Sequence, residues 1–177
     1  MIYNIHNSSF YPPFFAIIIS IPSIIIPFFA QGRITKYFKQ STSFHYRLFE
    51  ENEELIRLFE KFSELRTKEE QATSVELAEH ATKVMRTLDE SIKNLKDIDS
   101  FYAYIRHVGA THHQVPGFKA DNFWKIEQPF LQAAKTTLGE RYTPNIESIY
   151  KLTIRFILEN LVKGYEDAGK QNGNGQT

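Results

Sequence analysis

Several residue types and patterns are missing from this chain of 177 residues, and each absence excludes a class of function. Cysteine is absent, which excludes disulfides, thiolate metal sites and a cysteine nucleophile. The 21 basic and 21 acidic residues balance, which argues against bulk electrostatic binding to nucleic acid, because such binding needs a basic surface. Neither a glycine-rich phosphate loop nor a sustained strand pattern is present. Apolar side chains at helical spacing remain, and they predict an all-α protein.

Charge is missing from the first 32 residues, which contain no aspartate, glutamate, lysine or arginine. Residues 10–30 are apolar and nearly long enough to cross a bilayer, but four prolines would break such a helix. A secretory signal fits poorly because no basic residue precedes the apolar run. We therefore expect residues 1–40 to be an apolar N-terminal extension: a membrane-associated segment, a targeting segment, or a stretch foreign to the native globular protein. The chain is expected to be cytoplasmic, and membrane-associated if residues 10–30 anchor it.

Residues 41–168 are predicted to form one helical domain, and residues 169–177 a flexible polar tail. A first helix is expected to end near residue 49, followed by a polar turn at 50–53, a short helix to about 65 and a charged loop at 66–73. Ser74 is a suitable N-cap for the next helix, and Asp97 or Asp99 for the one after it, which Pro116 and Gly117 should stop.

Two longer helices complete the predicted domain. The first covers residues 121–138, and Pro129 is expected to kink it or to mark a weak point. Gly139 should end it. The last helix begins at Pro144, because proline fits best at the first helical position, and it should run to about residue 168.

Two histidines lie in the apolar stripes of two different predicted helices. His80 follows Leu77 in the stripe of residues 77–95, and His112 follows Phe101, Ile105 and Val108 in the next helix. Taken alone, each is more simply explained as a hydrogen-bonded core residue. Together they favour a shared haem site, because neutral imidazole is a common axial ligand of haem iron. At a helix end, carbonyls of the preceding turn can accept the other ring N–H of such a ligand.

Several motifs in fixed order resemble those of the globins, most closely the neuroglobin-like and nematode globins. They are LIRLF, which ends at Phe59, HATKVM at residues 80–85, VGATH at 108–112, VPGFKADNFW at 115–124 and TLGERYTPNIESIYKLTIRFIL at 137–158. The resemblance implies a globin-like three-over-three helical sandwich. Residues 1–40 do not show the pattern of the first globin helix, so that helix is expected to be absent or replaced.

The resemblance also implies a site for haem b. His112 would bind the iron from the proximal side. His80 would lie on the distal side, either donating a hydrogen bond to a bound gas or acting as a sixth ligand. The residues implied as apolar walls are Phe59, Val84, Val108, Phe118 and Phe123. The implied function is reversible binding of O2 or another diatomic gas for storage, transport or sensing, rather than an enzyme activity beyond incidental redox chemistry at the iron.

Some alternatives remain open from sequence. His113 competes with His112 for the proximal role, although the Gly-x-x-His spacing favours His112. His45 falls where globins place a bulky apolar distal residue, and it either enters the pocket or faces solvent. The function has two rivals: a bis-histidyl redox globin acting in electron transfer or in nitric oxide and nitrite chemistry, and a helical interaction protein that has lost haem.

Overall fold

The computed structural model describes residues 47–59, 64–65, 67–95 and 97–173. The regular secondary structure of this part of the chain is helical throughout, which confirms the all-α prediction. After a helical turn at residues 47–51, the elements are α3 (Glu53–Ile56), α4 (Lys68–Thr73), α5 (Val75–Asn94), α6 (Ile98–His112), η1 (Ala120–Ile126), α7 (Glu127–Leu138), η2 (Gly139–Arg141) and α8 (Pro144–Gly173). The predicted N-terminal extension, the expected absence or replacement of the first globin helix, and His45 all concern residues outside the described part of the chain.

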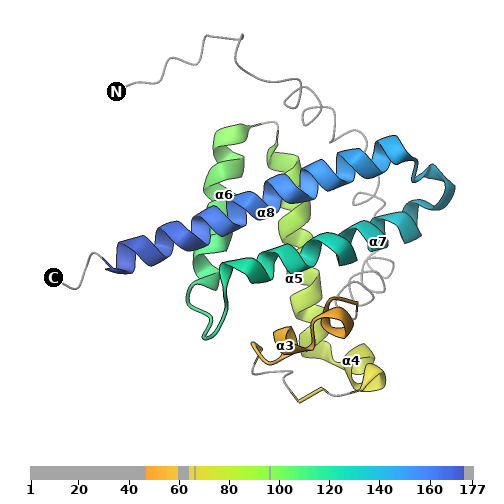
Figure 1. Ribbon diagram of the computed structural model, residues 1–177, viewed down its shortest axis with the longest axis horizontal. Helices are drawn as coiled ribbons and strands as arrows, with labels where there is room; N and C mark the ends of the chain where they lie inside the picture. The colour runs from red at the N-terminus through yellow and green to blue at the C-terminus, as the bar shows by residue number, and fades with distance from the viewer. Residues whose placement is uncertain (1–46, 60–63, 66, 96, 174–177) are drawn as a thin grey trace, which may run out of the picture.

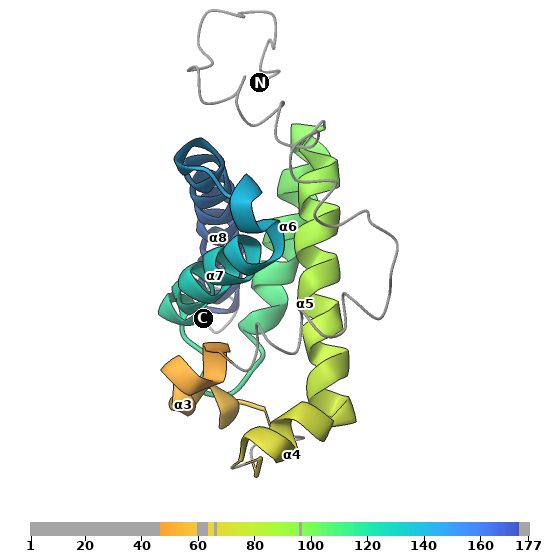
Figure 2. The same cartoon turned by 90° about the vertical axis from the view of Figure 1, so that its right-hand side faces the viewer.

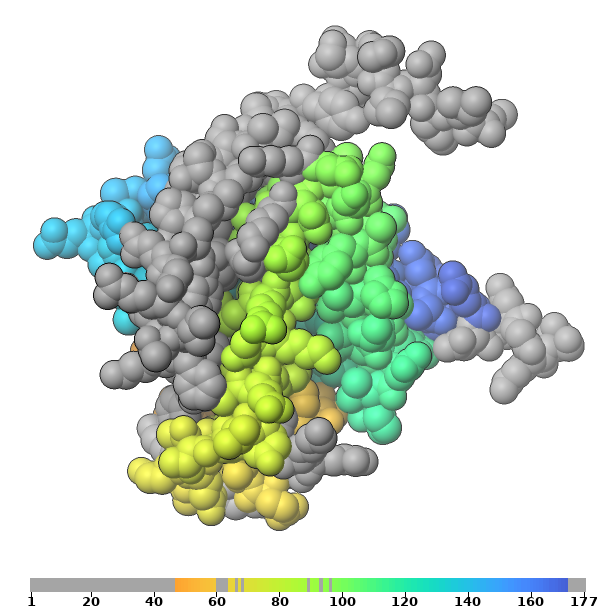
Figure 3. Space-filling model, turned by 180° about the vertical axis from the view of Figure 1, so that it is seen from behind, coloured from red at the N-terminus to blue at the C-terminus, as the bar shows by residue number. Residues whose placement is uncertain are grey.

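The longer helices form two layers that cross each other (Figures 1 and 2). One layer holds α7 and α8, which are joined by the short η2 turn and run antiparallel side by side. The other holds α5 and α6, whose outer surfaces lie next to each other on the back of the molecule (Figure 3). The short helices α3 and α4 lie at one end of this arrangement.

The two helices that carry the paired histidines begin at side-chain caps. The backbone N–H of Leu77 donates to Ser74 Oγ at 3.1 Å at the start of α5, and that of Ser100 donates to Asp97 Oδ1 at 3.2 Å at the start of α6. Such caps satisfy N–H groups that the first helical turn leaves without a carbonyl partner. Both caps are among the positions that the sequence predicted.

Helices α6 and α8 approach each other closely at two glycines. A Cβ on Gly109 would lie 2.1 Å from the carbonyl oxygen of Leu161, and one on Gly164 would lie 2.1 Å from that of Arg106. Neither position therefore accepts a larger side chain without moving a backbone. The crossing fixes the position of α6, which ends at His112, against the long helix α8.

The apolar core has two parts. The large part lies between the layers and includes Phe101, Phe123 and Tyr150. The small part lies at the end near α3 and consists of Leu48, Phe49, Leu55, Ile56 and Leu77. Ile126, at the end of η1, packs against both parts. The two parts are therefore separate clusters that meet at η1.

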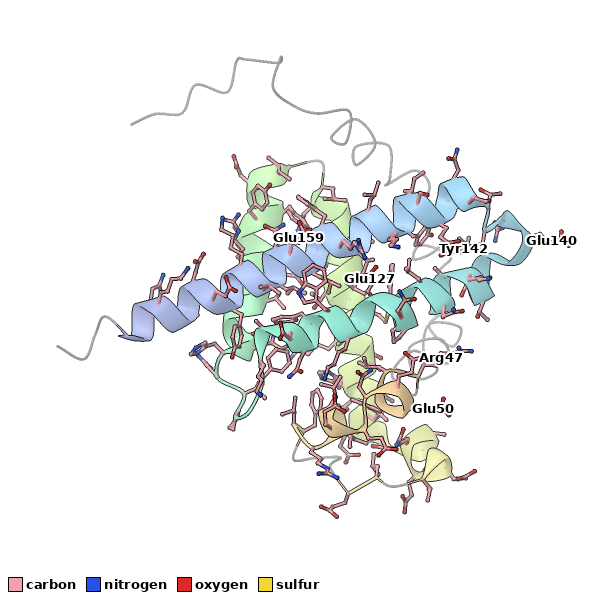
Figure 4. All side chains as sticks on the ribbon, viewed as in Figure 1. Arg47, Glu50, Glu127, Glu140, Tyr142 and Glu159 are labelled. Carbon is pink, nitrogen blue, oxygen red and sulfur yellow. The ribbon has the colours of Figure 1, made fainter. Side chains whose placement is uncertain are left out.

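A polar contact adds to the packing between α7 and α8. Glu127 begins α7 and lies between α7 and α8, where it accepts a hydrogen bond from Arg155 Nε at 2.9 Å (Figure 4). Glu140 and Tyr142 mark the turn that joins the two helices in the same view.

Some helix boundaries differ from the sequence predictions. Residues 68–73 are helical rather than loop, because Thr67 and Glu70 form a reciprocal capping box at the start of α4. The short helix expected to reach residue 65 ends at Ile56. At the other end of the chain, α8 continues through Gly173, into the stretch that we expected to be a flexible tail.

The helix predicted at residues 121–138 is divided into a 3-10 segment, η1, and the α-helix α7. Pro129 falls in the first turn of α7, where a missing backbone N–H removes no helical hydrogen bond, so it does not kink the helix.

Among the described residues, no helix combines the length and the apolar character needed to cross a bilayer.

Candidate functional site

A cavity of about 60 Å³ lies where the two parts of the core meet. Its walls come from segments that are far apart in sequence: the 47–51 turn, α3, α5, the end of α6, and η1 with the residues before it. The lining residues are Leu48, Phe49, Leu55, Leu58, Phe59, His80, Val84, His112, Phe118, Asn122, Phe123 and Ile126. Two imidazoles and one amide are thus the polar side chains in an otherwise apolar wall.

His112 is oriented by the helix that carries it. Its Nδ1 lies 2.8 Å from the carbonyl oxygen of Val108, one turn earlier in α6. A carbonyl can only accept, so in the neutral imidazole the proton is on Nδ1 and the lone pair of Nε2 is available to a metal. The rings of Phe118 and Phe123 each lie 5.0 Å from the His112 ring and support it from the side of η1.

His80 enters the same cavity from α5. Its ring meets that of Phe59 at a centroid distance of 4.6 Å in an edge-to-face arrangement, and Phe59 in turn contacts Phe49 at 6.0 Å. Val84, one turn further along α5, also lines the cavity. The edge-to-face contact is a favourable geometry for aromatic rings, and it restricts the orientations open to the His80 ring.

Burial keeps both imidazoles neutral at physiological pH. Desolvation is the main cause that lowers the pKa of His80 from 6.5 to about 4, and the proximity of His112 and of the Lys83 charge contributes to the same shift. Desolvation also lowers the pKa of His112, against the hydrogen bond to Val108, which raises it. A neutral imidazole is the form that binds a metal, so both rings are in the state required of a ligand.

His113, the alternative proximal residue, faces away from the cavity. Its ring lies 5.0 Å from the ring of Tyr165, and its Nε2 would lie 2.9 Å from a Cβ on Gly169, so it packs against α8. The Tyr165 hydroxyl donates a hydrogen bond of 2.8 Å to the carbonyl of Phe118. This contact fixes the segment after α6, and with it one wall of the cavity.

Six of the seven residues that the sequence indicated lie around this cavity: Phe59, His80, Val84, His112, Phe118 and Phe123. Val108 does not line it. Its side chain packs against the larger part of the core, and its contribution to the site is the carbonyl that accepts from His112. His107, off the apolar stripe of α6, is exposed.

The sequence did not indicate the remaining lining residues: Leu48, Phe49, Leu55, Leu58, Asn122 and Ile126. Helical spacing marked the first four as apolar positions of their own segments, and Ile126 follows Phe123 at a helical step. No local signal indicates that these segments meet. Asn122 has no sequence signal for the site.

The donor set is too small for a bare metal ion. Within the described residues, no group of three or more histidine, cysteine or carboxylate side chains gathers at one point. Protein metal sites usually supply three or four ligands. A pair of imidazoles in an apolar cavity instead suits a metal whose other ligands belong to a prosthetic group.

Comparison with known proteins identifies the family. A profile of the family described as Globin matches residues 42–161. The chain belongs to the globin family.

This globin is similar to fish proteins named neuroglobin. It is 28% identical over 125 residues to the neuroglobin of Dissostichus mawsoni, an alignment that covers 68% of this chain and 78% of the relative. It is 27% identical over 124 residues to that of Tetraodon nigroviridis, covering 70% and 77%. The resemblance to globins of this type that the motifs indicated is therefore confirmed.

A solved structure shares the fold of this globin. It is the crystal structure of a hexacoordinated heme protein from an anhydrobiotic tardigrade, with a TM-score of 0.78 over 88% of this chain and 99% of that one. The sequence identity is 24%, so the likeness concerns the fold. Together with the family match, it confirms the predicted all-α globin fold.

Proposed function

We propose that this globin holds haem b in the cavity between α5 and α6 and binds O2 or another diatomic gas reversibly. The observation that carries the proposal is the placement of two neutral imidazoles, His80 and His112, on one apolar cavity. When bound there, haem would supply an iron centre that can coordinate a diatomic gas.

The residues fit such a group in their chemistry. His112 offers an Nε2 lone pair, and its Nδ1–H is already used by the Val108 carbonyl, an arrangement that makes the imidazole a better donor. Phe59, Val84, Phe118 and Phe123 would cover the faces of a planar apolar macrocycle and keep water from it. The walls must separate to admit a porphyrin, because the cavity of about 60 Å³ has room for only a few water molecules.

His80 decides between two functions of the site. As a neutral imidazole it carries one N–H that can donate a hydrogen bond and one nitrogen that can act as a ligand. The first role suits reversible gas binding for storage, transport or sensing. The second suits a bis-histidyl centre for electron transfer or for nitric oxide and nitrite chemistry. The second is supported by the cavity that His80 and His112 share.

Carbon monoxide and O2 binding to the haem-loaded, reduced protein tests the proposal. We expect reversible uptake of both.

In His80→Leu, O2 release should accelerate about tenfold if His80 donates a hydrogen bond, because such a bond contributes about 1.5 kcal/mol. If His80 is a ligand, His80→Leu should instead accelerate gas association. His107→Leu is the matched control, since His107 is exposed on α6. Failure of the haem-loaded protein to take up either gas would contradict the proposal.

A further inference from the structure

In the described part of the chain, the wall of the cavity formed by α3 is a single helical turn. Helix α3 has only four residues, Glu53–Ile56, and its buried side chains Leu55 and Ile56 belong to the smaller part of the core. The residues that follow, Leu58 and Phe59, complete this wall. A helix of one turn derives little stability from its own hydrogen bonds, so its position depends on tertiary contacts.

The neighbouring wall is η1, whose Ile126 packs against the same small cluster as Leu55 and Ile56. Phe123 and Ile126 line the cavity from there, and Lys125 lies between them in sequence. The 3-10 geometry of η1 gives way to α-helix at Glu127, and such changes within a helical segment often mark a hinge.

One ion pair joins the two walls. Lys125 Nζ on η1 contacts Glu54 Oε1 on α3, although the two residues are 71 positions apart in sequence. The hydrogen bond from Lys125 is the main cause that lowers the pKa of the Glu54 carboxyl. Each partner is the immediate neighbour of a lining residue: Glu54 precedes Leu55, and Lys125 precedes Ile126. Separation of the walls therefore requires this contact to break.

We propose that the Glu54–Lys125 ion pair is a latch that holds the α3 wall against η1 and slows the passage of a large planar ligand into and out of the cavity. The proposal rests on the function proposed above as far as haem is concerned. The opening of α3 itself does not depend on haem. The side chain of Glu54 is 61% exposed, so the latch is weak and is screened by salt.

The first test is the rate at which haem leaves the full-length loaded protein for an excess of a haem-free acceptor. Glu54→Gln and Lys125→Gln should each accelerate the loss about two- to fivefold, the range expected for an exposed ion pair. The double variant should be no faster than the single ones, and the charge-swapped Glu54→Lys/Lys125→Glu should restore slow loss. At about 1 M salt, where the Debye length is about 3 Å, the difference from the native chain should disappear.

Glu53→Gln provides the matched control, because it removes the same charge from the same first turn of α3. Among the described residues no ion pair of Glu53 is present. If Glu54→Gln accelerates haem loss no more than Glu53→Gln does, the latch is refuted.

The second test separates the latch from the proposed function. The amides of Leu58 and Phe59 donate to the carbonyls of Leu55 and Ile56, so their hydrogen exchange reports the opening of this wall in the haem-free chain. Glu54→Gln should accelerate their exchange about two- to fivefold over Glu53→Gln, whether or not the protein binds haem. Equal exchange in the two variants would refute the latch. A chain that fails to bind haem but shows the difference would contradict the proposed function and leave the latch standing.

Discussion

The pKa values of the cavity histidines link the site to the stability of the fold. Burial lowers the pKa of His80 from 6.5 to about 4 in the folded chain, whereas in the unfolded chain it returns to its ordinary value. Below about pH 6.5 the unfolded chain therefore binds a proton that the folded chain does not. The free energy of unfolding of the haem-free chain should fall as the pH drops from about 6.5 to about 4, by up to about 3 kcal/mol from His80 alone.

Urea unfolding of the haem-free chain at about pH 7 and about pH 4.5 measures this effect. His80→Leu should flatten the pH dependence, because the apolar side chain takes no proton. His107→Leu should leave it unchanged, because His107 is exposed on α6. The same pH dependence in His80→Leu as in the native chain would show that His80 is not the buried neutral group.

At the level of the helices, the close approach of α6 and α8 leads to a prediction about Gly109. In an isolated helix, Gly→Ala would be favourable by about 0.5–1 kcal/mol. Here the new Cβ would lie 2.1 Å from the Leu161 carbonyl oxygen, so the two helices must move apart. Gly109→Ala should therefore destabilise the protein by about 1–3 kcal/mol, as overpacking does elsewhere.

Thermal or urea unfolding of Gly109→Ala, with Ala103→Gly as the control, tests this crossing. Ala103 is exposed on the same helix, so its replacement measures helix propensity without the close contact. Because α6 ends at His112, Gly109→Ala should also weaken haem binding. An increase in stability for Gly109→Ala would contradict the close crossing.

The sequence predicted the starts of some helices and missed those of others. Ser74 and Asp97 were found as caps because a short polar side chain precedes a clear apolar stripe. The capping box of Thr67 and Glu70 was missed, because α4 is short and has no apolar stripe to mark it. The division between η1 and α7 was missed because the apolar spacing continues from one segment into the other. The two segments differ in their backbone hydrogen-bond pattern and not in the types of their side chains.

In the molecule as a whole, the cavity depends on contacts that local patterns do not encode. The resemblance to globins implied the two histidines and five apolar wall residues, of which Val108 does not line the cavity. The residues that join α3 to η1 were not predicted, because Glu54 and Lys125 meet only after the chain has folded. Likewise the choice between His112 and His113 required the contact of His113 with Tyr165 on α8.

The central claim is that His112 holds haem in this cavity, and the absorption spectrum of two single variants tests it most directly. His112→Ala should lose the strong Soret band that the haem-loaded native chain is expected to show, because no other imidazole of α6 faces the cavity in the described structure. His113→Ala should keep that band, because its ring packs against α8. A native Soret band in His112→Ala, or its loss in His113→Ala, would contradict the account.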